Sequence, residues 1–392
     1  MFKIFAKIIS LDWEHAIFAY NIRQAGFVSV ELTAPDGAVR SYRSSEAVGT
    51  GRLKLDDLEA DCSYSGKFLW NKKEIKFGFK TLPKPEGEML GAFSVIADPH
   101  LSCRLENRKG RLLVESAMLL DDVVKQCNVL HNDFILLPGD ITNKGLETEY
   151  AASQKILSQL QAPYMAVAGN HDVDSRGERD ALWQAWFGGF EHVMETDYAL
   201  FLGLDTSRGG LNPSSIAILE KALQQKKMLC IFTHYQLFDN IDINQGTTRK
   251  IINNAASCKQ LLDKLTRIPS IIYAGHQNVP SVKTCNKAVQ INMPQPVQYP
   301  CGFTYVRCYA NGFYHTFMPI SSEVMRQYSL YTGNQAAEFY NEPQWEGLYR
   351  EGKSIEQLNF IVKGKHHVRQ FNGDQYNRIR RGKCSRKLTA VS

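Results

Sequence analysis

The sequence has no hydrophobic run long enough to cross a membrane, which argues against a membrane-spanning protein. Its nine cysteines are an odd number without CxxC spacing, so neither a disulfide framework nor a zinc ribbon is indicated. Lys3 and Lys7 give the start a basic character, but no small-residue cleavage site follows and an acidic residue appears at Asp12. A secretory signal is therefore not expected. These absences predict a cytoplasmic protein without a membrane partner.

Most of the chain also has little net charge of either sign. The formal net charge is +6, yet residues 363–392 alone carry +8, from nine Lys or Arg and one Asp, which leaves −2 for the rest. Such a basic tail could attract nucleic acid through counterion release. A solvated terminus is the favoured interpretation, because Phe371 and Tyr376 lie among the charges without forming a recognisable nucleic-acid-binding motif. The sequence does not indicate an oligomeric state.

The 392 residues, 44% of them hydrophobic, can form two or three domains. Residues 1–88 contain short, mostly alternating segments of aromatic and β-branched residues and no convincing helix, which predicts a small all-β sandwich domain. A Pro- and Gly-containing linker at 82–87 ends it. The expected strands are 16–21, 27–32, 39–43, 68–70 and 75–80.

From residue 89 to residue 320 the pattern changes to short continuous apolar runs, typical of strands that are buried on both faces. These runs are 93–97, 134–137, 164–168, 228–232 and 271–273, and later strands are expected at 289–292, 303–309 and 313–317. Helical segments between them are expected at 112–126, 147–160, 216–225 and 258–265. Strands that alternate with helices predict an α/β domain over 89–320. Residues 321–392 form a C-terminal extension with a helix over 322–330 and the basic tail.

Polar residues follow each of the five apolar runs, where the carboxyl ends of strands meet at one rim. They are Asp98-Pro99-His100, Gly139-Asp140-Ile141-Thr142-Asn143, Gly169-Asn170-His171-Asp172, His234 and Gly275-His276-Gln277-Asn278. Carboxylate, imidazole and amide ligands suit manganese, iron, zinc or magnesium better than a soft metal. The glycines at 139, 169 and 275 are expected to let the backbone turn sharply. Two cations ~3.5–4 Å apart can clamp the attacking and leaving oxygens of a phosphoester. The pattern therefore predicts a two-metal phosphoester hydrolase.

The order D-x-H, GD-x-x-N, GNHD, H, GH resembles the calcineurin-like metallophosphoesterase superfamily. The resemblance is greatest to its bacterial cyclic-nucleotide and glycerophosphodiester phosphodiesterase branch, through residues 137–145 (LPGDITNKG), Glu149-Tyr150 and residues 204–207 (LDTS). It implies a layered α-β-β-α sandwich over 89–320, and residues 1–88 resemble the fibronectin type III-like domains of some members. Purple acid phosphatases fit less well, because they have a tyrosine at the position of Asn143 and lack the histidine found here as His100.

The resemblance also implies roles for single residues. Asp98 and His100 would bind the first metal, Asp140 would bridge both metals, and a hydroxide between the metals would attack phosphorus. His171 would act as general acid, Asp172 would orient it, and Asn143 would bind the phosphodiester substrate. The second metal would be held by Asn170, His234 and His276.

Asn278 departs from the family pattern, which has a histidine ligand to the first metal at this position. An amide oxygen is a weaker and harder ligand than imidazole. A weakened but working first site is the favoured interpretation, because the other motif residues are intact. The alternatives are phosphomonoesterase or nucleotide pyrophosphatase activity at the same site, or a catalytically impaired scaffold.

Overall fold

The computed structural model describes residues 5–174, 176–225, 227–239, 251–277, 279–339 and 358–364. Asn278 and the basic tail from residue 365 onward, both singled out by the sequence, lie outside the described residues. Within them, none of the helices combines the length and apolar character that a membrane crossing requires.

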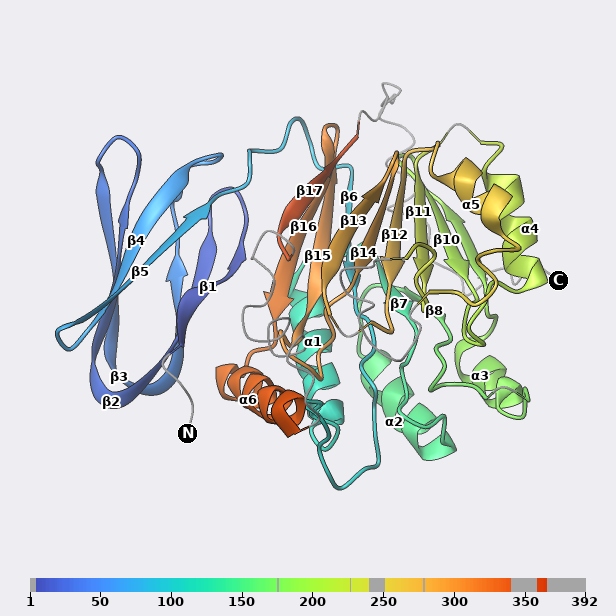
Figure 1. The fold of residues 1–392 in the computed structure, drawn as a ribbon, viewed down its shortest axis with the longest axis horizontal. Coiled ribbons are helices and arrows are strands. Elements are labelled where there is room, and N and C mark those ends of the chain that lie inside the picture. Colours follow the sequence, from blue (N-terminus) through green and yellow to red (C-terminus); the bar gives the residue numbers. More distant parts are fainter. Residues whose placement is uncertain are drawn as a thin grey trace.

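The first part of the chain forms a five-stranded antiparallel sheet (Figure 1, blue). Its order is β1-β2-β4-β5, and β3 pairs with β2 along most of that strand. Alternate residues of β2, such as Phe18 and Val30, enter a core that belongs to this sheet. The strands are β1 (Phe5–Leu11), β2 (Ala16–Thr33), β3 (Val39–Leu55), β4 (Ser63–Trp70) and β5 (Lys73–Lys80).

The predicted all-β region is confirmed, and residues 5–88 contain no helix. The segments expected as separate strands at 16–21 and 27–32 are instead one strand, β2, because a register irregularity between Ile22 and Gly26 lets pairing with β3 continue. β1 was not expected, since Lys7 interrupts its apolar pattern.

Two six-stranded sheets make up the rest of the strand structure. The first has the order β17-β16-β15-β6-β7-β8, and the second β13-β14-β12-β11-β10-β9. Parallel pairing joins β6, β7 and β8 in one sheet and β10, β11, β12 and β14 in the other, so their carboxyl ends share a direction within each sheet. The strands are β6 (Gly91–Val95), β7 (Phe134–Pro138), β8 (Tyr164–Val167), β9 (His192–Glu195), β10 (Leu200–Leu204), β11 (Leu229–Thr233), β12 (Ser270–Ala274), β13 (Ser281–Cys285), β14 (Ala288–Asn292), β15 (Gly302–Tyr309), β16 (Gly312–Pro319) and β17 (Phe360–Lys363).

The two sheets are layered between helices (Figure 1). Phe134 and Leu136 of β7 pack between the sheets with Phe232 of β11, while Ile135 and Leu137 face the helices. Helices α1 (Ser116–Val129), α2 (Glu147–Leu157) and α3 (Asp180–Phe187) contribute to the core on the outer side of the first sheet, and α4 (Pro213–Ala222) and α5 (Lys259–Leu265) to that on the outer side of the second. The predicted α-β-β-α layering is confirmed.

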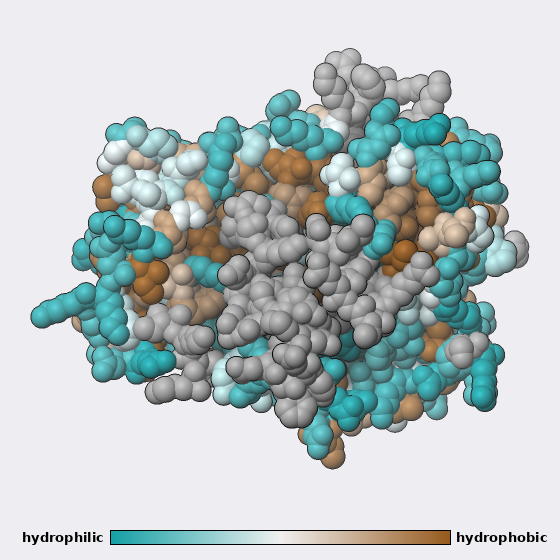
Figure 2. All heavy atoms as spheres, in the orientation of Figure 1, coloured by the Kyte–Doolittle hydropathy of each residue, from teal (hydrophilic) through white to brown (hydrophobic). Residues whose placement is uncertain are grey.

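Helix α6 (Glu323–Phe339) lies between the N-terminal sheet and the two-sheet core. Arg52 of β3 donates from Nε to a carboxylate oxygen of Glu323 at 2.9 Å, and α6 also packs on the loop that leads to α1. On the face shown in Figure 2, hydrophilic side chains line the outer edges and hydrophobic residues reach the surface in separate patches. Domain boundaries at 88 and 320 stay predictions.

Candidate metal centre

The predicted site residues follow β6, β7, β8, β11 and β12, and the structure brings those among the described residues, which exclude Asn278, together at one rim. Four of them have backbone conformations that side chains rarely adopt: φ is 46° at Asp98, 43° at His100, 50° at Asp140 and 63° at His276. Such left-handed conformations cost free energy and tend to concentrate at functional sites. Their gathering at this rim indicates that the chain bends to direct these side chains inward.

His234 lies at the centre of one side of the site and is fully buried. Its Nδ1 is 3.1 Å from the carbonyl oxygen of Pro138, which can only accept, so Nδ1 carries the proton. The other nitrogen, Nε2, is 3.0 Å from Oδ1 of Asn170, 3.3 Å from Oδ2 of Asp140 and 3.2 Å from Nδ1 of His276. Three ligand-type atoms thus lie within 3.3 Å of Nε2 of His234.

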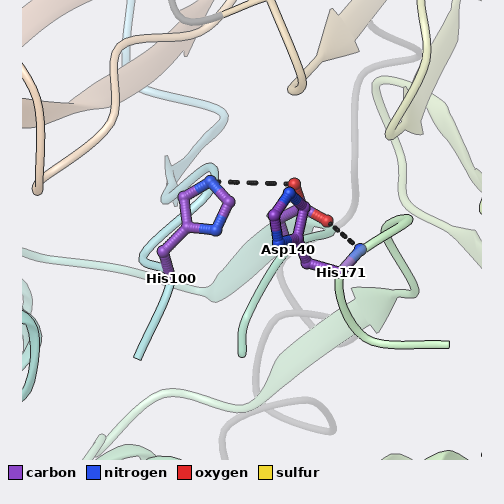
Figure 3. Close-up of side chains that lie close together, drawn as sticks. All are labelled: His100, Asp140 and His171. Carbon is purple, nitrogen blue, oxygen red and sulfur yellow. Dashed lines mark hydrogen bonds and ion pairs between the residues drawn. The ribbon is translucent and has the colours of Figure 1, made fainter. Parts of the chain in front are cut away.

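His100 also approaches the carboxylate of Asp140, and its ring lies beside that of His171 (Figure 3). Its Nε2 is 3.7 Å from Oδ2 of Asp140, and the backbone N–H of His171 donates to Oδ1 of Asp140 at 2.8 Å. His100 is 1% exposed, and neither of its ring nitrogens makes a hydrogen bond to any described residue. A buried imidazole without a hydrogen-bond partner is costly, so this side chain is suited to an additional ligand.

Asp98 is the remaining carboxylate among the predicted metal ligands. It is 1% exposed, and both of its carboxylate oxygens accept from the backbone N–H of His276, at 3.0 and 3.1 Å. Its Oδ1 lies 3.6 Å from Nδ1 of His234. Asp98 therefore joins the segment after β6 to the segment after β12.

The charges of these buried groups depend on one another. Burial would raise the pKa of Asp140, but the neighbouring charges of His234 and His100 hold it well below its usual range. Burial would lower the pKa of His234, but Asp140 and Asp98 raise it to about 9. Burial raises the pKa of Asp98 to about 7. The two carboxylates thus favour positive charge at the centre of the site.

The residues fit a pair of divalent cations. His100, Asp140 and His171 place ligand atoms within 4.8 Å of one another, and so do Asp140, His234 and His276. Asp140 belongs to both groups. Ligating histidines usually donate their second ring nitrogen to a carbonyl or carboxylate, as His234 does to Pro138. The fit rests on this geometry and on the buried ring of His100.

The structure places Asp172 differently from its expected role. Its carboxylate is fully buried and accepts from the backbone N–H groups of Ile141, Thr142 and Gly169 and from the hydroxyl of Thr142, at 2.7–3.2 Å. The ring of His171 is instead held by the carbonyl oxygen of Asn143, 2.7 Å from Nδ1. Asp172 thus fixes the loop that carries Asp140, because its lone pairs are used by that loop.

The side-chain amide of Asn143 is also buried at the site. The residue is 5% exposed, and its side-chain Nδ2 has no hydrogen-bond partner. A buried donor without an acceptor is suited to an anionic ligand.

The glycines of the motifs serve two purposes. Gly139 has a φ of 87°, as the expected sharp turn requires. Gly169 and Gly275 do not; instead, a Cβ on Gly169 would lie 2.2 Å from Oδ1 of Asp140 and one on Gly275 would lie 2.9 Å from Oδ2 of Asp98. At these two positions glycine is required because neighbouring atoms, including the carboxylates, occupy the space that a Cβ would fill.

Sequence reasoning missed one side chain at this rim, Tyr235, and one whose charge acts on it, Arg111. The ring of Tyr235 stacks on His276, with centroids 4.0 Å apart, and its position directly after His234 was the only available signal. Arg111 lies close enough that its charge, after burial, lowers the pKa of His100. Nothing in the sequence distinguishes it from the other basic residues of its polar loop.

Comparison with known proteins agrees with this geometry. Residues 92–306 match the family model described as calcineurin-like phosphoesterase, which covers more than half of the chain. A probable glycerophosphodiester phosphodiesterase from Arcobacter nitrofigilis is 26% identical over 174 residues, 42% of this chain and 63% of that protein. The chain thus matches less than two thirds of that relative's length.

Two further similarities extend this picture. A probable cyclic nucleotide phosphodiesterase from Rhodopseudomonas palustris is 27% identical over 207 residues, 48% of this chain and 72% of that protein. A solved dimetal phosphatase from Danio rerio is 14% identical, with a TM-score of 0.47 over 59% of this chain and 96% of that one. Because the family model spans the strands that carry all five motifs, the chain belongs to the calcineurin-like phosphoesterase family.

Proposed function

We propose that this protein is a divalent-metal-dependent phosphodiesterase. The observation that carries the proposal is the convergence of His100, His234 and His276 on the shared carboxylate of Asp140. Asp98, His100 and Asp140 would hold one cation, and Asp140, Asn170, His234 and His276 the other. Asn278, which lies outside the described residues, would add a ligand to the first. Manganese or iron are the proposed metals, since the donors are oxygen and imidazole.

A pair of cations here would supply Lewis acidity that lowers the pKa of a water molecule and offsets charge on the phosphoryl oxygens. The protein residues would orient the substrate and move a proton. Since the carbonyl of Asn143 holds Nδ1 of His171, Nε2 remains available to donate a proton to the leaving oxygen. The unpaired Nδ2 of Asn143 would donate to a phosphoryl oxygen.

The substrate class is proposed from the phosphodiesterase names of the curated relatives, and phosphomonoesters and nucleotide pyrophosphates are the alternatives to test. We also place the protein in the cytoplasm. The eight cysteines of the described residues are all free, and six of them are buried, which suits a reducing compartment.

The test is hydrolysis of bis(p-nitrophenyl) phosphate by metal-stripped protein to which manganese is returned. We expect activity to return with the metal and to be lost in His234→Ala. His131→Ala is the matched control, because His131 is an exposed histidine whose only ion pair is with Asp133, away from the site. Protein that stays inactive with manganese, iron, zinc and magnesium would contradict the proposal.

A further inference from the structure

Glu149 is a buried acidic residue in the first turn of α2. It is 0% exposed, and within the described residues its carboxylate has no ion-pair partner. Its two oxygens accept instead from backbone N–H groups, that of Cys103 at 3.2 Å and that of Lys144 at 2.7 Å. A buried carboxylate without a cation costs free energy, and a neutral acceptor could satisfy either N–H group at a lower cost. The charge at this position therefore indicates more than support of the loops.

The peptide unit between Asn143 and Lys144 connects this carboxylate to His171. Its N–H, which belongs to Lys144, donates to Oε2 of Glu149 at 2.7 Å. Its carbonyl oxygen, which belongs to Asn143, accepts from Nδ1 of His171, also at 2.7 Å. One peptide unit thus lies between a buried carboxylate and the imidazole proposed above as general acid, with a hydrogen bond at each end.

A peptide unit can transmit the influence of a charge because its C–N bond has partial double-bond character. A negative oxygen at the N–H draws electron density toward the carbonyl oxygen, which then accepts a hydrogen bond more strongly. Linked hydrogen bonds of this kind strengthen one another by about 10–30% per bond. The carbonyl of Asn143 should therefore hold Nδ1 of His171 more firmly than an isolated carbonyl would, which keeps the ring in one orientation and one tautomer.

The carboxylate and the peptide unit are both held in place by other contacts. The backbone N–H of Asn143 donates to the carbonyl of Leu101 at 2.9 Å. Because Oε1 of Glu149 accepts from the backbone N–H of Cys103, the carboxylate joins the segments that follow β6 and β7. The hydrogen bond to Lys144 is thus fixed from both ends, and little freedom is lost when the site binds a ligand.

We infer that Glu149 is a positioning residue for the general acid: through the peptide unit between Asn143 and Lys144, its carboxylate orients His171 and strengthens the hydrogen bond that holds its ring. Glu149 thereby takes the role that the sequence predicted for Asp172, whose carboxylate is used by the N–H groups of residues 141, 142 and 169. This inference rests on the proposed function and deepens it, since a general acid matters most when the leaving group departs poorly.

The dependence of the hydrolysis rate on the leaving group tests this inference. Glu149→Gln keeps the shape of the side chain and removes its charge. It should slow hydrolysis of diphenyl phosphate, whose phenol needs a proton as it leaves, by about tenfold. Bis(p-nitrophenyl) phosphate, whose nitrophenolate leaves readily, should be slowed by no more than about threefold. A side chain that only supports the loops would affect both esters equally, and Glu149→Asp, which keeps a carboxylate, should recover part of the rate with diphenyl phosphate.

A double-mutant cycle shows whether the effect passes through His171. In His171→Asn, the further change Glu149→Gln should cause no additional loss of rate with diphenyl phosphate. Glu147→Gln is the matched control, because Glu147 is exposed in the same turn of α2, and it should change neither rate beyond about twofold. Equal slowing of the two esters by Glu149→Gln, or an additional loss in the double variant, would overturn the inference.

Nuclear magnetic resonance of metal-free protein reads the same hydrogen bond without hydrolysis. The Nδ1–H proton of His171 is assigned by its absence in His171→Asn, and it should move upfield in Glu149→Gln but not in Glu147→Gln. If Glu149→Gln does not fold, Glu149→Asp takes its place with a smaller expected shift. An unmoved resonance would overturn the inference, even where wild type hydrolyses both esters. A moved resonance in a protein that hydrolyses neither ester would overturn the proposed function and leave the link between Glu149 and His171 standing.

Discussion

The two sides of Asp140 are held in different ways. On one side, His234 has a partner at each ring nitrogen, and its contacts extend to Asn170 and His276. On the other side, His100 is just as deeply buried, but neither ring nitrogen is hydrogen-bonded, and the positive charge of Arg111 is near. The first arrangement is preorganised, whereas the second needs a ligand to satisfy it. We propose from this difference that the residues around His234 bind a cation more tightly than those around His100.

Asp140→Asn should have the largest effect, because this carboxylate serves both sides. We expect the hydrolysis rate to fall by about 10³-fold, since cations contribute several kcal/mol of charge stabilisation in the transition state. Steady-state kinetics with bis(p-nitrophenyl) phosphate measure the loss. Asp263→Asn, at an exposed position of α5, is the control. A rate within about tenfold of wild type would show that Asp140 does not join the two sides.

A third buried histidine separates the effect of burial from the effect of missing partners. His315 is fully buried like His100, but its nitrogens contact the hydroxyl of Tyr273 and the carbonyl of Phe313, each at 3.1 Å. Burial lowers the pKa of His315 to about 3. As the pH falls, the unfolded chain takes up a proton near pH 6.5, its ordinary pKa, but the folded protein does not until about pH 3. Stability should therefore fall by about 1.4 kcal/mol per pH unit between these values.

Urea unfolding of metal-free protein at pH 7 and pH 5 measures this pH-dependent loss of stability. Between the two pH values, wild type should lose about 2 kcal/mol more than His315→Gln, which cannot titrate in this range. An equal loss in both proteins would show that His315 is protonated in the folded state.

A smaller effect is expected when each side of the site is replaced in metal-free protein. His234→Leu should destabilise it by about 1–3 kcal/mol, because Asn170 and the carbonyl of Pro138 lose their partner. His100→Leu should be neutral or stabilising by about 1 kcal/mol, because it removes a buried ring without hydrogen bonds. Denaturant midpoints without metal give both values. Equal destabilisation by the two substitutions would contradict the difference between the sides.

Much of the fold was predictable because the strands of both sheets are buried on two faces. Such strands appear in the sequence as unbroken apolar runs, and the polar residues after 93–97, 134–137, 164–168, 228–232 and 271–273 could be assigned to one rim. β1 was missed because Lys7 interrupts its apolar residues and its pairing with β2 depends on residues further along the chain. Local sequence patterns do not reveal which segments pair with one another.

The sequence predicted which residues form the site better than it predicted the contacts between them. The motifs identified the residues around Asp140, but they could not show that Asp172 would be saturated by the loop at 141–142 or that the carbonyl of Asn143 would hold His171. Backbone carbonyls have no sequence signature, and the position of Arg111 depends on its contact with Gln298 and on the contact of the preceding residue, Gly110, with α6. Both features arise only when distant segments meet.

The unequal binding of two cations around Asp140 can be measured directly by titrating metal-stripped protein with manganese. We expect wild type to bind two equivalents whose affinities differ by about tenfold or more, a difference of about 1.4 kcal/mol. His100→Ala should lose the weaker equivalent and keep the tighter one. A single equivalent in wild type, or the loss of both in His100→Ala, would contradict the account.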